Sequence, residues 1–466
     1  MAADLHHDSR ELRRALGLWS AVSIVIGTVI GSGIFLVPKT MVLQVGTPAM
    51  VFAVWIFGGL LSLAGALTYA EMAAAMPEAG GEYVYLREAY GPFWGFLYGW
   101  TQMWVAKSGS IATLATGFFY YLANFNRGLE ATLFQIPLPL GDSGGPLPVS
   151  LGQLLAIAVI LILGAINYFG VRAGGGVQLF VTGLKVALIG AIIAFGIFGG
   201  QGNAQNFSSS TPAPGGVAAF FAALVAALWA YDGWNNVGMV ASEVKNPQKN
   251  LPRALIYGCA AVIGIYLLTN LAYFYVLGAS EVASHDRVAS EMMRRVLGPF
   301  GADAVSIAAM ISIFAALNGS ILSGSRVPYA LARDGYFFAP FKNVDPIHRT
   351  PVFSIVALSL WASVLVLSGR YDQLLTLVIF PSWILYGMSA FAVIVLRKRR
   401  PDLPRPYKTV GYPAVPIVFT LVAVLLLGYT VRNSPRESAL GLAIIAAGLP
   451  FYFHWRNRLN RGRRPS

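Results

Sequence analysis

The triplet Gly31-Ser32-Gly33 lies inside the first long apolar stretch of the chain, which runs from about Leu18 to Val45. Glycine is a poor helix former, and a helix broken at this depth exposes N–H and C=O groups that hydrocarbon cannot satisfy. The chemistry such groups offer is the binding of charge, because N–H groups at the start of a half-helix attract anions and free carbonyls attract cations. Glycine triplets also allow close helix packing, so binding and packing are both open at this point.

A second interruption is predicted in the run from Trp229 to Asn236, which places Asp232, Gly233 and two asparagines in an otherwise apolar stretch. Counted along the chain, the two interruptions fall in apolar spans one and six. That separation is expected when spans 1–5 and 6–10 are inverted repeats whose first helices both unwind around a central site. The halves share no obvious residue identity, so this hypothesis rests on the paired interruptions.

The elements that must position these residues are membrane spans. Hydrophobic residues make up 56% of the 466 residues and charged residues only 11%, which predicts an all-α polytopic membrane protein. The first span follows a charged leader without a convincing cleavage site, so we interpret it as a retained helix. The single cysteine, Cys259, lies in an apolar stretch and excludes an intramolecular disulfide.

Stretches long enough to cross a bilayer suggest 12 transmembrane helices. Their approximate limits are 17–45, 48–75, 92–123, 149–169, 174–199, 217–242, 254–278, 302–330, 352–369, 373–396, 412–431 and 437–455.

Most lysine and arginine residues between these spans fall on one side of the membrane if both termini are cytoplasmic, which is the orientation we predict. The net charge of +13 is concentrated in basic runs at 397–400 and 456–464. Such runs beside membrane helices contact anionic lipid headgroups, so the expected partner is the lipid bilayer and no nucleic acid.

The segments that carry a family resemblance are Val25 to Phe35, Gly80-Gly81-Glu82-Tyr83, Ala230 to Asn235 followed by Glu243, Asn246-Pro247 and Asn250-Leu251-Pro252, and Leu317-Asn318-Gly319-Ser320 before Ser325-Arg326. In order and spacing they resemble the L-type amino acid transporter branch of the amino acid–polyamine–organocation (APC) superfamily, over spans one to ten. The resemblance implies a LeuT-type fold with 5+5 inverted repeats, broken helices 1 and 6 and two extra helices. It implies transport of amino acids by alternating access in the plasma or inner membrane.

The corresponding regions of the chain are a cytoplasmic tail 1–16, a first repeat 17–199, a second repeat 217–396, helices 11 and 12 within 412–455, and a cytoplasmic tail 456–466.

An amino acid zwitterion matches the charges of a broken helix. We expect its carboxylate at the N–H groups of Ser32 and Gly33 and its ammonium at carbonyls near Val29 and from Trp229 to Asp232. The resemblance makes Trp229 an aromatic gate, although a core aromatic is the alternative. The expected substrate-binding residues are Val29, Ile30, Gly31, Ser32, Gly33, Trp229, Ala230, Tyr231, Asp232 and Gly233.

Asp232 stands where this family often has glycine. A carboxylate in mid-membrane costs roughly 2.5–3.5 kcal/mol even on a lenient scale, so it needs a partner or a task. It could cap the broken helix through backbone N–H groups, or it could hold a cationic substrate side chain. Both interpretations are open, and so is the choice between neutral and cationic substrates.

Lys185 lies near the middle of span five, too far from either end to reach water. By resemblance, this lysine replaces the sodium ion that bridges helices one and eight in sodium-coupled relatives. Its expected acceptors are the carbonyls from Gly27 to Ile30 and the hydroxyls of Ser320 and Ser323. The consequence is sodium-independent transport. Reversible protonation of Lys185 would instead couple transport to protons, and a purely structural lysine is a third possibility.

Four further charged residues, Glu71, Glu82, Glu243 and Arg326, fall near predicted cytoplasmic ends and are expected to form ion pairs. The histidines lie outside the spans or at their ends, and no phosphate loop, carboxylate pair or nucleophile–base arrangement occurs. We therefore expect no metal, no cofactor and no enzyme activity.

The function predicted is a sodium-independent amino acid exchanger; the alternatives are a proton-coupled symporter or a sensor that binds without transporting. A channel is disfavoured because it needs a continuous polar pore. Animal members of the resembling branch join a heavy subunit through a loop cysteine after span three. The loop from Asn124 to Pro148 contains none, so we expect no disulfide-linked heavy subunit.

Overall fold

The computed structural model describes residues 12–137, 146–367 and 371–462. The ends of the two predicted tails, 1–11 and 463–466, lie outside the described residues. The elements up to residue 198 are α1 (Leu18–Val29), α2 (Gly33–Val45), α3 (Pro48–Ala75), α4 (Glu82–Tyr90), α5 (Pro92–Thr101), the π-helix η1 (Gln102–Ala106), α6 (Lys107–Leu122), the 3-10 helix η2 (Arg127–Glu130), β1 (Thr132–Ile136), β2 (Leu147–Ser150), α7 (Leu151–Tyr168) and α8 (Val171–Phe198).

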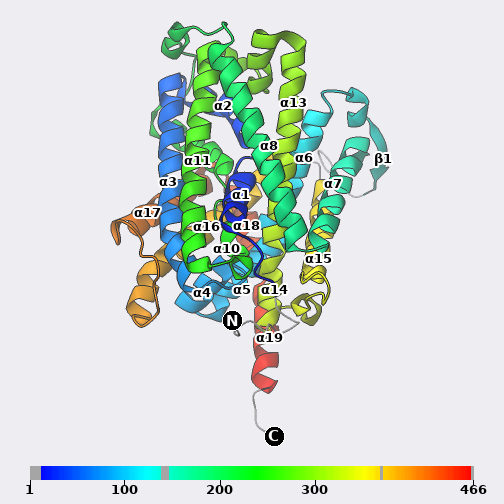
Figure 1. The fold of residues 1–466 in the computed structure, drawn as a ribbon, viewed down its shortest axis with the longest axis vertical. Coiled ribbons are helices and arrows are strands. Elements are labelled where there is room, and N and C mark those ends of the chain that lie inside the picture. Colours follow the sequence, from blue (N-terminus) through cyan, green and yellow to red (C-terminus); the bar gives the residue numbers. More distant parts are fainter. Residues whose placement is uncertain (1–11, 138–145, 368–370, 463–466) are drawn as a thin grey trace, which may run out of the picture.

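The elements of the remaining chain are η4 (Ala204–Ser208), α9 (Gly216–Ala230), α10 (Asn236–Met239), η5 (Ala241–Glu243), α11 (Pro247–Val276), α12 (Ala279–Ser284), α13 (Val288–Gly324), α14 (Arg326–Arg333), η6 (Ala339–Lys342), α15 (Val352–Leu367), α16 (Tyr371–Arg399), α17 (Ala414–Asn433), α18 (Pro435–Ala447) and α19 (Leu449–Gly462). Figure 1 shows most of the long helices running along the long axis of the molecule.

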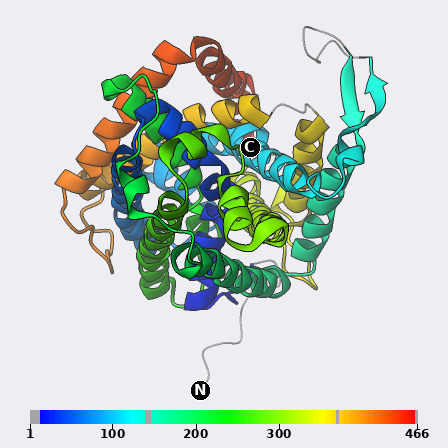
Figure 2. The same cartoon turned by 90° about the horizontal axis from the view of Figure 1, so that it is seen from above.

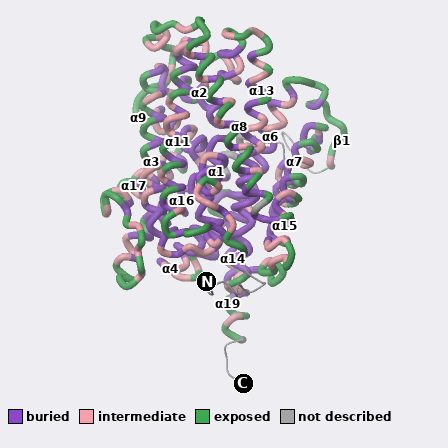
Figure 3. The backbone as a smooth tube through the Cα atoms, viewed as in Figure 1, coloured by how far each residue is buried: buried purple, intermediate pink, exposed green. Residues whose placement is uncertain are grey.

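Helix α1 lies in the centre of the bundle, where it packs against α8, α11 and α13 (Figure 1). The antiparallel hairpin β1–β2, a small exception to the predicted all-helical fold, projects from the periphery when the bundle is seen from above (Figure 2). The interior is buried and the outer helix faces are exposed (Figure 3).

The exposed faces are apolar. Phe180 on α8 is 72% exposed and Val424 on α17 is 60% exposed. Exposing such apolar side chains to water would be unfavourable, whereas contact with lipid is not. Among the described residues, eight helices are long and apolar enough to cross a membrane, and α1 with α2, bent by 42°, would make a ninth. The protein is therefore a multi-pass membrane protein.

Both predicted interruptions coincide with departures from helical geometry. Helix α1 ends at Val29 and α2 begins at Gly33. After α9 ends at Ala230, Gly233 adopts φ +106°, and a Cβ on it would lie 3.2 Å from the carbonyl carbon of Thr28. Only glycine combines this backbone angle with so close an approach to the first interruption.

The observed boundaries differ from the predicted ones in several spans, and the predicted span 437–455 is divided between α18 and α19. The stretch 92–123 is divided into α5, η1 and α6, and the stretch 217–242 ends in the four-residue helix α10. Helix α13 starts at Val288, before the predicted 302, and is kinked at Gly298, where φ is +69°. Hydropathy does not detect these changes because they follow backbone geometry and leave the apolar composition unaltered.

Candidate functional site

A small cavity of about 20 Å³ lies between the two helix interruptions. A cavity of this size has room for one water molecule and is too small for an amino acid. It lies beside both interruptions and beside α6. Its lining residues are Thr28, Val29, Gly31, Ser32, Gly33, Ser110, Leu114, Trp229, Ala230 and Asp232.

Three of the expected substrate-binding residues do not line this cavity. The hydroxyl of Tyr231 donates to the carbonyl of Trp55 at 3.1 Å, and its ring packs edge-on against the Trp55 ring. The carbonyl of Gly233 accepts a hydrogen bond from the Thr28 hydroxyl at 2.9 Å. The carbonyl of Ile30 faces Lys185 instead.

The first turn of α2 meets the end of α9 at one side of the cavity. A Cβ on Gly33 would lie 2.7 Å from the Cβ of Ala230 and 2.8 Å from its Cα, so glycine permits this contact. Ser32 precedes the first turn and is 1% exposed. The first N–H groups of a helix have no acceptor within the helix, so the start of α2 presents donors and a positive dipole end here.

Tyr266 on α11 links the two interruptions and was missed by the sequence analysis. Its hydroxyl lies 2.7 Å from the carbonyl oxygen of Ala230 and 3.1 Å from that of Val29. A hydroxyl donates only one proton, so it alternates between these acceptors. The only signal in the sequence was a tyrosine in an apolar span, which needs a partner for its O–H.

Asp232 faces the cavity with its carboxylate already engaged. Its Oδ1 accepts a hydrogen bond from the Tyr386 hydroxyl at 2.9 Å. The positive charge of Lys107 on α6 also acts on it. The carboxylate thus has a partner without a substrate.

Lys185 on α8 is fully buried and donates to backbone carbonyls at the end of α1. Its Nζ lies 2.9 Å from the Gly27 oxygen and also contacts the Ile30 oxygen. The hydroxyl of Ser312 on α13 donates to the same Ile30 oxygen at 3.0 Å. An ammonium and a hydroxyl thus converge on one carbonyl, beside the first interruption and outside the cavity.

The two serines expected to accept from Lys185 lie elsewhere on α13. The Ser323 hydroxyl donates to the Gly319 carbonyl at 2.7 Å within its own helix. Within the described part of the chain, no hydrogen bond joins Ser320 or Ser323 to Lys185. Ser312, which does reach the Ile30 carbonyl, was missed by the sequence analysis.

Glu82, at the start of α4, has no ion-pair partner within salt-bridge distance among the described residues, contrary to the expectation. It accepts hydrogen bonds from the Asn235 amide and from the Tyr98 hydroxyl, the latter at 2.9 Å. Burial raises the pKa of this carboxyl to about 7. The neighbouring Lys107 donates to Asn236 at 2.6 Å, so polar contacts continue from Asp232 towards α4.

Comparison with known proteins decides the family. Residues 16–448 match the family described as amino acid permease. The chain belongs to the amino acid permease family. This permease is 34% identical to the "Serine/threonine exchanger SteT" of Bacillus subtilis (strain 168) over 457 residues, covering 97% of this chain and 99% of that protein.

Two human relatives extend the range of substrates named. The permease is 33% identical to the human "b(0,+)-type amino acid transporter 1" over 447 residues, covering 95% of this chain and 88% of the relative. It is 30% identical to the human "Cystine/glutamate transporter" over 445 residues, covering 95% and 85%. These similarities support the L-type branch of the APC superfamily, and its members are transporters, not enzymes.

Buried charges pair at the end of the bundle that carries α14. Arg326 and Glu243 form an ion pair at 2.7 Å, both fully buried, as expected from the sequence. The backbone N–H groups of Ala15 and Leu16 donate to the carbonyl of Glu243, each at 2.9 Å. Glu71 pairs with Arg397 at 2.7 Å, also as expected.

We expect Arg326→Gln to destabilise the permease, since it leaves the Glu243 carboxylate buried without its cation. Breaking a buried pair by removing one partner costs about 3–5 kcal/mol. Thermal unfolding in detergent measures the effect. Arg333→Gln is the matched control, because its pair with Glu78 is exposed and exposed pairs contribute at most about 1 kcal/mol. Equal effects of the two substitutions would contradict the assignment.

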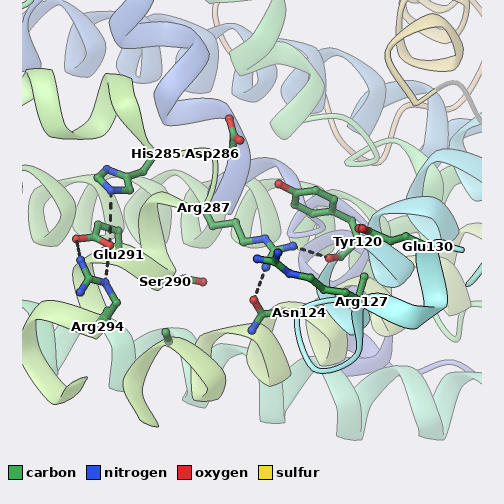
Figure 4. A pocket seen from close by; sticks show the side chains of 12 residues that line it. Tyr120, Asn124, Arg127, Glu130, His285, Asp286, Arg287, Ser290, Glu291 and Arg294 are labelled. Carbon is green, nitrogen blue, oxygen red and sulfur yellow. Dashed lines mark hydrogen bonds and ion pairs between the residues drawn. The ribbon is translucent and has the colours of Figure 1, made fainter. Parts of the chain in front are cut away.

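A hollow of about 440 Å³ lies where α6 ends and α13 begins (Figure 4). Arg287 donates to Asn124 at 2.5 Å, and its guanidinium carbon lies 4.4 Å from the centre of the Tyr120 ring. Other charged residues of the hollow lie around Arg287, and among them Glu291 pairs with Arg294 at 2.6 Å.

Proposed function

We propose that this permease exchanges amino acids across the cell membrane by alternating access, with the substrate bound between the two helix interruptions. The observation that carries the proposal is the small cavity lined from both interruptions. A buried ion pair closes one end of the protein, and a hollow opens at the α6–α13 end. Transport then requires the central cavity to expand and the ion-paired end to open in turn.

In this proposal the substrate carboxylate binds the N–H groups of Ser32 and Gly33 at the start of α2. The ammonium binds carbonyls near Val29 at the end of α1 and from Trp229 to Asp232 at the end of α9. The Ala230 carbonyl has two lone pairs, so its hydrogen bond from Tyr266 leaves one position for the substrate. Trp229, which lines the cavity, is the proposed gate.

Sodium independence is proposed from Lys185. Its ammonium supplies a positive charge to the carbonyls of Gly27 and Ile30, which are the kind of ligands a sodium ion would use. A fixed charge at this position makes an added cation unfavourable. Under this proposal neither a sodium gradient nor a proton gradient drives net uptake, and the permease works as an exchanger.

Small neutral amino acids are the proposed substrates. The Tyr386 hydroxyl already donates to the carboxylate of Asp232, which leaves that carboxylate less available to a cationic side chain. The serine/threonine exchange named for the Bacillus relative agrees with a small pocket. Uptake of labelled serine should be inhibited by excess alanine and unaffected by excess arginine. Inhibition by arginine would overturn this assignment.

For topology, we propose 12 transmembrane helices with both termini cytoplasmic and two inverted repeats, 17–199 and 217–396. The α14 end would then face the cytoplasm of the plasma or inner membrane. The proposed assembly contains no disulfide-linked heavy subunit, because the single cysteine, Cys259, is buried in α11.

Proton-coupled symport is a second candidate, favoured by Glu82. Its pKa of about 7 lets it change charge near neutral pH, and Asn235 connects it to the second interruption. In this alternative an inward proton gradient drives uptake into vesicles that contain no amino acid, and Glu82→Gln removes that dependence.

Glu82→Gln also has an expected effect on stability. A carboxyl whose pKa is higher in the folded than in the unfolded protein destabilises the fold once the pH rises above its pKa in the unfolded chain. The loss of stability reaches at most about 3 kcal/mol, at a pH where the carboxyl is ionised in the folded protein as well. The variant should therefore unfold at a higher temperature than the wild type at pH 8 and at the same temperature at pH 4. An equal difference at both pH values would contradict the raised pKa.

A further inference from the structure

A wide groove of about 960 Å³ lies between η6 and α19 at the α14 end of the bundle. Its apolar wall is aromatic and includes Phe337, Phe338 and Trp455. The rings of Phe337 and Phe338 lie 5.6 Å and 5.2 Å from that of Trp455, so the segment just before η6 meets α19 through these rings. Lys342 and Arg458 also line the groove.

A second hollow of about 370 Å³ adjoins this groove and shares Phe337 and Phe338 with it. Its lining is apolar and includes Leu360 and Val364 of α15, which are 53% and 52% exposed. These side chains point outward from an apolar helix, where acyl chains would surround it. The two hollows are therefore neighbours on either side of Phe337 and Phe338, one apolar and the other with a basic part.

The basic part lacks an internal counterion. Among the described residues, no acidic side chain lines either hollow, and neither Lys342 nor Arg458 forms an ion pair. Nearby arginines behave differently, since Arg333 pairs with Glu78 at 3.1 Å and Arg400 pairs with Glu88 at 3.2 Å. Two cations beside an apolar hollow match a ligand with an anionic head and an apolar tail.

We propose that this groove binds an anionic phospholipid. The phosphate lies between Lys342 and Arg458, and one acyl chain passes Phe337 and Phe338 into the apolar hollow on α15. Under the orientation proposed above, this end lies at the cytoplasmic leaflet, whose anionic lipids attract basic residues next to membrane helices. The bound lipid would hold η6 against α19.

Native mass spectrometry of the full-length permease, with added phosphatidylglycerol or phosphatidylcholine, tests the proposal. We expect retention of phosphatidylglycerol in preference to phosphatidylcholine. The double substitution Lys342→Gln and Arg458→Gln should weaken phosphatidylglycerol binding about 30-fold, at roughly 1 kcal/mol per basic residue. Lys398→Gln with Lys408→Gln is the matched control, which removes two exposed charges outside the groove and should leave binding unchanged.

Other outcomes would overturn the proposal. Equal retention of both lipids would mean nonspecific lipid contact, and equal loss in the two double variants would mean a general effect of charge. A dimer that excludes lipid would make the groove an interface between copies. Thermal unfolding with glycerol phosphate provides a second test, because stabilisation equal to that by the lipid would leave no role for the acyl chain. None of these readouts depends on transport.

Discussion

Lys185→Met is expected to abolish amino acid uptake. The substitution keeps the unbranched apolar part of the side chain and removes the ammonium that contacts the Gly27 and Ile30 carbonyls. Hydrogen bonds from a charged donor contribute about 1.5–3 kcal/mol each, so losing two lowers the stability of the end of α1 enough to reduce uptake about 100-fold or more. Uptake of labelled serine into proteoliposomes measures the loss.

Lys39→Met is the matched control for this prediction. The Lys39 ammonium lies 2.5 Å from Asp286, and the Asp286 side chain is 71% exposed, so this pair contributes at most about 1 kcal/mol. The control should transport as the wild type does. Turnover of Lys185→Met at the wild-type rate and independent of pH would remove the proposed role of Lys185.

Gly33→Ala should reduce uptake roughly ten- to hundred-fold while the protein still folds. The new methyl group would lie 2.7 Å from the Ala230 Cβ, so α2 and α9 must separate beside the proposed carboxylate site. Overpacking of this kind costs about 1–3 kcal/mol. Binding of labelled serine to the purified variant shows whether the defect lies in substrate binding.

Gly264→Ala is the corresponding control in α11, because a Cβ there would meet nothing within 4 Å. It adds the same methyl group to a helix without a clash and should leave uptake unchanged. If Gly33→Ala bound and transported serine as well as Gly264→Ala did, the substrate could not lie at the α2–α9 contact.

The sequence located the interruptions because glycine and buried polar residues in an apolar span have few structural explanations. Gly31 and Gly33 predicted the end of α1, and Gly233 predicted the turn after α9. The sequence also predicted the carbonyl acceptors of Lys185 at the end of α1, because a lysine in mid-membrane requires acceptors and an interrupted helix supplies them. These are local properties of each span.

Contacts between helices could not be predicted in the same way, because they depend on how far each helix is shifted along its axis. Ser312, Ser320 and Ser323 all lie on α13, but the two predicted serines lie at a different depth from Ser312, which makes the contact. Eight residues of α-helix span roughly 12 Å, which is the distance by which Ser320 misses the level of Ser312. Tyr266 was missed because one tyrosine in an apolar helix does not reveal which carbonyl it contacts.

Glu82 illustrates a second limit of the sequence. Its position near the predicted end of a span suggested an ion pair, yet the fold surrounds it with the neutral donors Asn235 and Tyr98. The packing of α4 against the second interruption determines the surroundings of Glu82, and hydropathy contains no information about this packing.

Uptake of labelled serine into sodium-free proteoliposomes, either empty or preloaded with unlabelled serine, tests the central claim most directly. The proposed exchange mechanism predicts rapid uptake into preloaded vesicles and none into empty vesicles, with or without a pH gradient. Uptake into empty vesicles driven by a proton gradient would contradict exchange and support the symporter. Absence of uptake from both, with serine binding retained, would contradict transport altogether.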